Sequence, residues 1–315
     1  MPHLPTNTYR IHKETSTAMA TRKSTTTTTP DVNVPQHPLA HLIPDEWFAN
    51  DYHGRKVGGV DDYDVLDTAF DLRHNVLLEG PTGSAKTSLV YAWAAKRGLP
   101  VVNIPCNGAA EPRSLFGGWV AQQDGSLAFV RGDLYLAVQY GGVAYFDEVN
   151  MMPPRIASVV HGLFDKRRTL TVLDAAGSAH PTTVVAHKDF FIVGAYNPGY
   201  TDTFDLNEAF KNRFAFKLVW NYDRNVEAKM IESHKLLDFA EALRKRVEDG
   251  TLRTPVATNM LIEFETFYAR SNLGFGFAVE MFLNAFHSDE RPIVKETLLA
   301  YQDDILAELS NIDFE

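Results

Sequence analysis

Short apolar runs alternate with amphipathic stretches between about residues 55 and 220. Four runs are bounded by polar residues, glycine or proline, as is typical of strands buried on both faces. They are Asn75–Glu79, Val101–Ile104, Gly142–Phe146 and Phe190–Ala195. Stretches with helical periodicity, such as Thr87–Arg97 and Pro154–Phe164, separate them. Strands that alternate with helices predict an α/β fold, with a parallel sheet flanked by helices.

The strand pattern ends near Tyr222, and only helical periodicity follows. The predicted helices are Arg224–Asp249, Asn259–Ala269, Ala278–Phe286 and Pro292–Leu309. Gly250 follows the first of them as a helix stop signal. The sequence therefore predicts an α/β domain at residues 40–222 and a small all-helical domain at residues 223–315.

The first 39 residues differ in composition from the rest. Up to residue 30 they hold four basic residues and a single acid, Glu14, and they include the low-complexity run Ser24–Thr29. We predict a disordered tail at residues 1–39. A transit peptide, which is also basic and poor in acids, is the alternative.

Charge and cysteine content narrow the function classes. The formal net charge of −10 disfavours general nucleic-acid binding, which depends on clustered Lys and Arg. The single cysteine, Cys106, suits a reducing cytoplasm, where we expect the protein. No apolar run approaches the roughly 20 residues that a membrane helix needs, so we expect no membrane partner.

A phosphate-binding motif follows the first predicted strand and opens a helix, as such a motif requires. We call Gly80–Thr87 (GPTGSAKT) the phosphate loop. Its backbone N–H groups and the helix N-terminus would hold the phosphates of ATP. Lys86 would reach the β- and γ-phosphates, and the Thr87 hydroxyl would ligate Mg²⁺. The predicted nucleotide-binding residues are Gly80, Pro81, Thr82, Gly83, Ser84, Ala85, Lys86, Thr87 and Ser88.

One position departs from the strict motif. Ala85 stands where a glycine usually precedes the lysine. Alanine adds one methyl group and tolerates helical backbone angles, so we expect the departure to be mild.

Two adjacent acids close the third predicted strand, at Val143–Glu148. In a protein with a phosphate loop, the first acid, Asp147, would hold the Mg²⁺ shell. The second, Glu148, would polarise the attacking water. A catalytic glutamate at this place predicts hydrolysis as well as binding.

Two further polar residues follow the next strand. The strand Phe190–Ala195 runs into Tyr196 and Asn197, and an amide at Asn197 could orient the water without adding charge. Arg213 is a candidate arginine finger, which would act on the ATP of a neighbouring subunit, and Lys211 is its rival. A finger acting in trans implies an oligomeric ring.

Together these motifs resemble the MoxR-type branch of the AAA+ P-loop ATPases, over roughly residues 55–310. This branch includes the ATPases that activate Rubisco and nitric oxide reductase, and the ATPase subunit of aerobic cobaltochelatase. The segments that carry the resemblance are GPTGSAKT, Leu115–Gly118, Phe129–Gly132, Gly141–Asn150, the strand pair Leu170–Leu173 and Thr182–Ala186 joined by Ala175–Ser178, Asn272–Phe277 and Asp289–Ile293.

The resemblance implies a hexameric ring that remodels, activates or assembles a partner protein. The partner of such ATPases often carries a von Willebrand factor A domain, and insertion of a metallocofactor is one such role. Phe116 and Trp119 lie in a stretch rich in glycine and aromatic residues, Pro112–Asp133. They would either face the pore or a partner, or pack onto the sheet.

The sequence departs from these relatives in the helical domain. They carry a sensor arginine early in a lid helix, whereas the matching stretch here, Val256–Asn259, has none. Arg270 is a distant substitute. Nucleotide sensing by the lid is therefore an open question.

Two other functions remain as alternatives. A nucleic-acid motor or restriction-type NTPase is one, since related rings act on DNA, but the acidic balance counts against it. A nucleotide-gated scaffold with slow turnover is the other, and the missing lid arginine is compatible with it. The scattered histidines show no ligand-like spacing, so we predict no metal besides Mg²⁺.

Overall fold

The computed structural model describes residues 37–106, 111–172, 181–198, 208–270 and 274–312. Most of the predicted tail, residues 1–39, lies outside them, so the prediction of disorder stays a prediction. Leu39, at the end of that range, is fully buried in the core.

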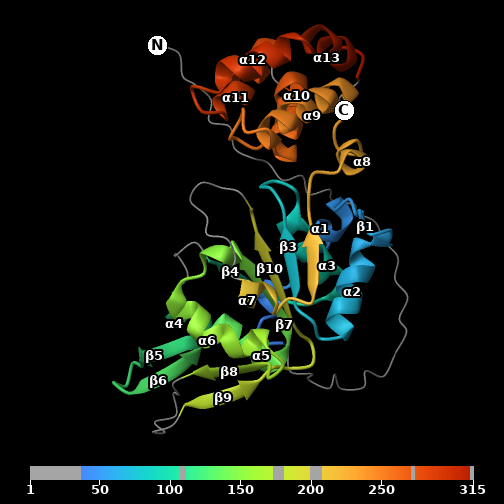
Figure 1. Ribbon diagram of the computed structural model, residues 1–315. Coiled ribbons are helices and arrows are strands. Elements are labelled where there is room, and N and C mark those ends of the chain that lie inside the picture. The colour runs from blue at the N-terminus through green and yellow to red at the C-terminus, as the bar shows by residue number, and fades with distance from the viewer. Residues whose placement is uncertain (1–36, 107–110, 173–180, 199–207, 271–273, 313–315) are drawn as a thin grey trace, which may run out of the picture. The chain divides into compact units, whose positions relative to one another are not determined.

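Five parallel strands form the central sheet, in the order β11-β3-β10-β7-β4 (Figure 1). They are β3 (Val76–Glu79), β4 (Val101–Pro105), β7 (Gly142–Asp147), β10 (Phe190–Tyr196) and β11 (Phe216–Val219). The four predicted strands and the predicted parallel α/β fold are confirmed. The edge strand β11 is an addition that the apolar pattern did not reveal.

Helices cover both faces of the sheet. One face carries α1 (Glu46–Asp51), α2 (Asp62–Asp71) and α3 (Lys86–Arg97), and the other carries α5 (Asp133–Tyr140) and α6 (Pro154–Phe164). Strand side chains alternate between the faces. Val143 and Tyr145 of β7 therefore pack with Trp93 of α3, whereas Ala144 and Phe146 pack in the cluster of α5 and α6. A strand covered on both faces reads as a continuous apolar run.

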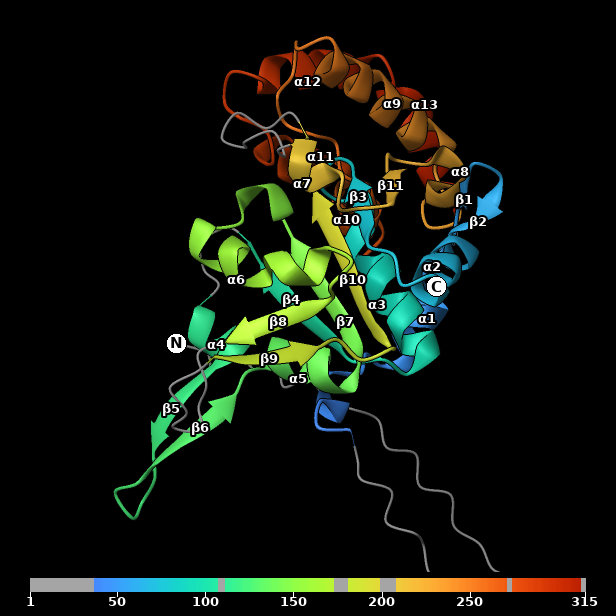
Figure 2. The ribbon, with the colours of Figure 1, turned by 60° about the horizontal axis from the view of Figure 1, so that its bottom comes forward.

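Three short antiparallel pairs lie outside the central sheet, and all three are labelled in Figure 2. They are β1 (Lys56–Val57) with β2 (Val60–Asp61), β5 (Gly117–Ala121) with β6 (Leu127–Arg131), and β8 (Thr169–Val172) with β9 (Thr182–Val185). The β8–β9 pair confirms the predicted strands, and their predicted link, Ala175–Ser178, lies outside the described residues. The β5–β6 hairpin lies in the glycine-rich stretch for which we predicted no strand.

The shorter helical segments are Ala40–Leu42, α4 (Pro112–Phe116), Val149–Met151 and α7 (Glu208–Lys211).

The segment after the sheet is helical and has its own apolar core. Its helices are α8 (Arg224–Glu227), α9 (His234–Glu248), α10 (Thr258–Arg270), α11 (Gly274–Asn284), α12 (Arg291–Leu299) and α13 (Gln302–Leu309). We call this segment the lid. The boundary predicted at residue 222 stays a prediction.

Two predicted lid helices are each divided in two. The first, Arg224–Asp249, breaks before α9, because the buried Ser233 caps that helix by accepting a hydrogen bond from the Leu236 N–H at 3.1 Å. The second, Pro292–Leu309, breaks at Ala300–Tyr301, where the Tyr301 ring lies against Phe239.

A buried carboxylate ties the loop before α10 to the loop before α12. Glu290 is 3% exposed and accepts hydrogen bonds from the backbone N–H groups of Arg253, Thr254 and His287 and from the Thr254 hydroxyl. Burial by itself would raise the pKa of Glu290, but these hydrogen bonds outweigh it and lower the pKa from 4.5 to about 2. The folded lid therefore favours the ionised form.

We expect Glu290 to make the lid sensitive to acid. Because its pKa is lower in the folded state, its contribution is complete above pH 4.5 and is lost as the pH falls towards 2. Between pH 6 and pH 3.5 the loss should reach about 1.4 kcal/mol. Denaturant titration at both pH values should show wild type losing that much more stability than Glu290→Gln. Equal pH dependence in the two proteins would contradict the assignment.

No helix among the described residues is long and apolar enough to cross a membrane.

Candidate functional site

The phosphate loop lies at the carboxyl end of β3 and leads directly into α3, whose first residue is Lys86. In the sheet, β3 lies between β10 and β11, and β11 is the last strand of the sequence. Ligands of open parallel sheets bind at the carboxyl ends of the strands, where the connections diverge. The fold therefore brings the loop to the edge at which β7 and β10 also end.

Ala85 adopts a left-handed conformation, with φ 68° and ψ 29°. Our expectation that it would adopt ordinary helical angles is wrong. The left-handed region costs an L-residue roughly 1–2 kcal/mol, which is why glycine is usual there. The departure from the strict motif therefore places strain in the loop.

Lys86 is 8% exposed, and its ammonium group is held by three acceptors. It donates to the carbonyls of Gly80 and Pro81, each at 2.8 Å, and to Asn197 Oδ1 at 2.6 Å. Burial lowers the pKa of Lys86 to about 8, although the carboxylates of Asp147 and Glu148 act in the opposite direction. The lysine and the amide that follows β10 thus meet.

A tyrosine that we did not predict connects the two candidate Mg²⁺ ligands. Tyr145 is fully buried, and its hydroxyl lies 2.9 Å from Thr87 Oγ1 and donates to Asp147 Oδ1 at 3.2 Å. Burial raises the pKa of Tyr145 well above its ordinary value, so the phenol keeps its single proton. Since that proton goes to Asp147, Thr87 donates to Tyr145 and keeps its lone pairs. The signal for Tyr145 was its position two residues before Asp147, on the same face of β7.

These residues fit a magnesium ion. A hydroxyl with free lone pairs and a carboxylate are the oxygen ligands that Mg²⁺ prefers, and it usually takes only one or two protein groups besides phosphate and water. Within the described residues, no group of three or more His, Cys, Asp and Glu side chains could hold a metal by itself. The donor set therefore suits an ion that arrives with a phosphate ligand.

Glu148 begins the turn after β7 in a left-handed conformation, with φ 53°. Strained backbone of this kind in a non-glycine residue is frequent at functional sites. The turn directs the chain away from the strand, and Glu148 lines the same cavity as Asp147 and Lys86.

That cavity has a volume of about 490 Å³, which is in the range of small-molecule sites. The predicted site residues that line it are Thr82, Gly83, Ala85, Lys86, Thr87, Ser88, Asp147, Glu148 and Asn197. Gly80, Pro81 and Ser84 belong to the loop but do not line the cavity. The buried Ser84 hydroxyl donates instead to the Pro81 carbonyl at 2.8 Å.

The cavity wall also includes residues that we did not predict. Trp47, Phe48 and Tyr52 come from the segment around α1, and Val226, Met230 and Ile262 come from the lid. The lid contributes Asp223, Glu227, Thr258 and Asn259 as its polar groups there, and none of its described arginine side chains. The expected substitute, Arg270, has a side chain outside those described.

Arg55 is a cation of this wall that sequence reasoning missed. Its guanidinium lies over the Trp220 ring, 4.3 Å from the ring centroid. It donates to the Ser84 carbonyl at 3.0 Å and to the Asn221 carbonyl at 2.5 Å. No motif marks an isolated arginine so far before the loop.

Arg213 does not line this cavity. It donates to the Ala209 carbonyl, and its Nη2 lies 2.8 Å from Nε2 of His161 in α6. Its rival, Lys211, lies over the ring of Tyr196. The role of Arg213 on a neighbouring subunit stays a prediction.

Comparisons with known proteins identify a matching family model and several similar chains. Residues 75–214 match the family model described as AAA domain (dynein-related subfamily). An uncharacterised protein of Staphylococcus aureus (strain USA300) is 31% identical, and the match covers 60% of this chain and 75% of that protein. One of Staphylococcus epidermidis is 32% identical with the same coverage. A crystal structure from Cytophaga hutchinsonii aligns over 88% of this chain and 92% of its own, with 16% identity and a TM-score of 0.42.

The matched range contains the phosphate loop, Asp147, Glu148, Asn197 and Arg213. It begins at the residue before β3 and ends before β11. Residues 75–214 therefore belong to the AAA domain family (dynein-related subfamily), and the protein is a nucleotide-binding ATPase.

Proposed function

We propose that this ATPase uses Mg·ATP hydrolysis to remodel, activate or assemble a partner protein complex, as MoxR-type ATPases do. The observation that carries the hydrolytic part is the meeting of Lys86, Asn197, Asp147 and Glu148 around one cavity. An amide, a cation and two acids there serve both phosphate binding and activation of water.

Each of these groups has a distinct task. When ATP binds, the Lys86 ammonium exchanges the backbone carbonyls of Gly80 and Pro81 for the β- and γ-phosphates. Its positive charge is then paired with the negative charge of the phosphates. Thr87 and Asp147 would hold Mg²⁺, which would supply positive charge to neutralise the charge that develops on the phosphates. Glu148 accepts a proton from the attacking water, and the Asn197 amide orients that water. Asn197 already lies on the Lys86 ammonium, so both would face the same phosphate.

The position of Arg213 supports a ring-shaped oligomer. Arg213 lies outside its own nucleotide cavity. A guanidinium in that position would stabilise transition-state charge on the ATP of a neighbouring subunit, and a hexamer is the closed arrangement that the resemblance implies.

The β5–β6 hairpin supports a protein partner. Four apolar side chains on it are 40–63% exposed: Trp119, Val120, Leu127 and Val130. Exposed apolar groups gathered on one element are typical of interaction surfaces. Phe116, just before the hairpin, is 6% exposed and packs in the core. Of the two aromatic residues, only Trp119 is therefore exposed enough to face the pore or a partner. A von Willebrand factor A domain is the partner class that we propose.

Phosphate release by the full chain with Mg·ATP tests this function against the nucleic-acid motor. We expect steady hydrolysis that single- or double-stranded DNA does not stimulate at low or physiological salt. Lys86→Ala should reduce both nucleotide binding and turnover to background, because the cation that faces the phosphates is gone. Stimulation by DNA that declines with salt would instead favour the motor. Undiminished turnover in Lys86→Ala would overturn the site assignment.

A further inference from the structure

Two side chains from outside the phosphate loop hold two of its peptide groups. The Tyr222 hydroxyl donates to the Thr82 carbonyl at 2.6 Å, and Arg55 donates to the Ser84 carbonyl at 3.0 Å. In a trans peptide the C=O and the following N–H point in opposite directions. The two contacts therefore fix the directions of the Gly83 and Ala85 N–H groups, which are donors that the phosphate loop offers to an anion.

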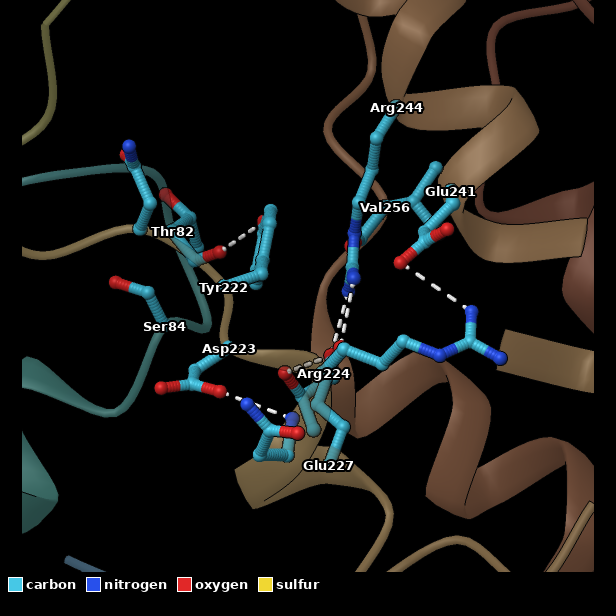
Figure 3. A network of polar contacts seen from close by, with 12 residues as sticks. Thr82, Ser84, Tyr222, Asp223, Arg224, Glu227, Glu241, Arg244 and Val256 are labelled. Carbon is cyan, nitrogen blue, oxygen red and sulfur yellow. Dashed lines mark hydrogen bonds and ion pairs between the residues drawn. The ribbon is translucent and has the colours of Figure 1, made fainter. Parts of the chain in front are cut away.

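Tyr222 belongs to the segment that joins β11 to α8, and a lid residue covers its ring. The Arg244 guanidinium, from α9, lies 3.8 Å from the ring centroid (Figure 3). A planar guanidinium stacks on an aromatic ring better than an ammonium does. The orientation of Tyr222, and with it the hydrogen bond to Thr82, therefore depends on Arg244.

Arg244 is fixed in turn by a buried ion pair. It donates to both carboxylate oxygens of Glu227, at 2.6 and 2.8 Å, and to the Val256 carbonyl at 2.9 and 3.0 Å. The two side chains are 14% and 3% exposed. Bidentate pairs of this kind combine strength with a defined geometry. Arg244 thus cannot move without α8 and the loop before α10.

The same carboxylate reaches the stretch where relatives carry the sensor arginine. Glu227 also accepts a hydrogen bond from the Thr258 hydroxyl at 2.7 Å. Next to Thr258, the Ala257 methyl lies against the loop, because a Cβ built on Gly83 would come within 2.5 Å of it. Thr258 and Glu227 both line the nucleotide cavity. The start of α10 therefore contacts the loop and is tied to Arg244.

Other contacts hold α8 to α9 independently. Arg224 pairs with Glu241 at 3.2 Å (Figure 3) and with Asp238 at 2.6 Å. Asp223 caps α8 by accepting a hydrogen bond from the Asn225 N–H. These pairs are about one-third to one-half exposed. The lid should therefore stay folded when the Tyr222 contact alone is removed.

We propose that Tyr222, Arg244 and Glu227 are positioning residues that couple the phosphate loop to the lid in place of a lid arginine. The proposal rests on nucleotide binding in the phosphate loop, as set out under the proposed function. Phosphate that binds the loop favours one orientation of the Thr82–Gly83 peptide. Tyr222 passes that preference to Arg244, and the ion pair with Glu227 passes it to α8 and α10. Because coupling is reciprocal, lid orientation also sets nucleotide affinity.

Hydrogen exchange of α9 and α10, measured on the full chain with and without ADP and Mg²⁺, tests the coupling. In wild type we expect ADP to slow exchange there by about fivefold or more, a typical coupling factor. Tyr222→Phe keeps the ring and the stack but loses the hydroxyl, and should reduce the effect to within about twofold. Arg244→Lys keeps the charge but loses the planar fork, and should do the same.

Tyr268→Phe is the matched control. The Tyr268 hydroxyl lies 3.4 Å from Ser310 Oγ, so both partners are lid residues. Its removal should leave the effect of ADP on exchange unchanged. Thermal unfolding of all variants identifies any that lose stability instead of coupling.

The outcomes separate the two proposals. If Tyr222→Phe binds ADP and still shows the full wild-type slowing in α9 and α10, Tyr222 is merely structural and the inference is overturned. The same holds if only Arg244→Lys loses the effect and its melting temperature falls with it. If wild type does not bind ADP at all, the nucleotide site itself is wrong, and both proposals fail.

Discussion

Replacing Glu148 by glutamine is expected to leave Mg·ATP bound and to slow its hydrolysis by about 10²–10⁴-fold, the usual contribution of a positioned general base. The amide has nearly the same shape as the carboxylate, so the left-handed turn at residue 148 and the neighbouring Asp147 should keep their places. The amide cannot accept the proton of the attacking water. Single-turnover phosphate release, together with ATP affinity, separates this loss of chemistry from a loss of binding.

Glu248→Gln is the matched control, because Glu248 is an exposed residue at the end of α9. It should hydrolyse ATP like wild type. If Glu148→Gln keeps the wild-type rate, Glu148 has no role as a base, and another acceptor must serve the water.

Replacing Arg213 by alanine should have an effect of about 10³–10⁵-fold on turnover, with ATP affinity unchanged. The reason is positional: Arg213 does not line its own cavity, and we propose that its charge acts on a neighbour's ATP. Mixing Arg213→Ala with Lys86→Ala subunits should restore part of the activity. In a mixed ring, an intact pocket from the first can meet an intact arginine from the second.

Phosphate release against mixing ratio, at fixed total protein, measures this rescue. Dilution should abolish it as rings dissociate by mass action. If the subunits exchange and no mixture exceeds the sum of its parts, Arg213 is not the trans finger. Lys211→Ala, tested in the same way, would then show whether the rival residue carries the role.

The sequence predicted the parts of the fold that depend on residues close to one another in the chain. A strand covered on both faces must be apolar at every position, so β7 and β10 stood out. The phosphate loop was recognisable because its glycines, lysine and threonine lie within eight residues between a strand and a helix. The proximity of Asn197 to Lys86 followed because parallel strands end at the same edge.

The features that escaped prediction depend on distant partners. The edge strand β11 alternates buried and exposed residues, as in Leu218 and Val219, and so lacks an apolar run. The β5–β6 hairpin is exposed on both strands, which removes the alternation that would have marked it. Arg55 and Tyr222 reach the loop from 29 and 140 residues away in the sequence. No spacing rule covers such contacts.

The left-handed angle of Ala85 is a different case. The residue type was visible, but its backbone angles follow from the closing of the loop onto α3. Ala85→Gly would remove the Cβ from that position, although glycine also gains freedom in the unfolded chain. The motif showed that Ala85 replaces a glycine. The expectation that alanine would be tolerated because the position is helical was wrong.

The first glycine of the loop is required by a neighbouring chain segment. A Cβ built on Gly80 would lie 2.0 Å from the Trp220 carbonyl oxygen, at the end of β11, and that oxygen belongs to rigid backbone. A signature usually explained by its fit to phosphate thus also records where the chain leaving β11 passes close to the end of β3. An alanine at position 80 would already be harmful in the nucleotide-free protein, by forcing that segment away. Surveys that score such loops by anion contact alone would attribute this folding defect to a loss of ligand.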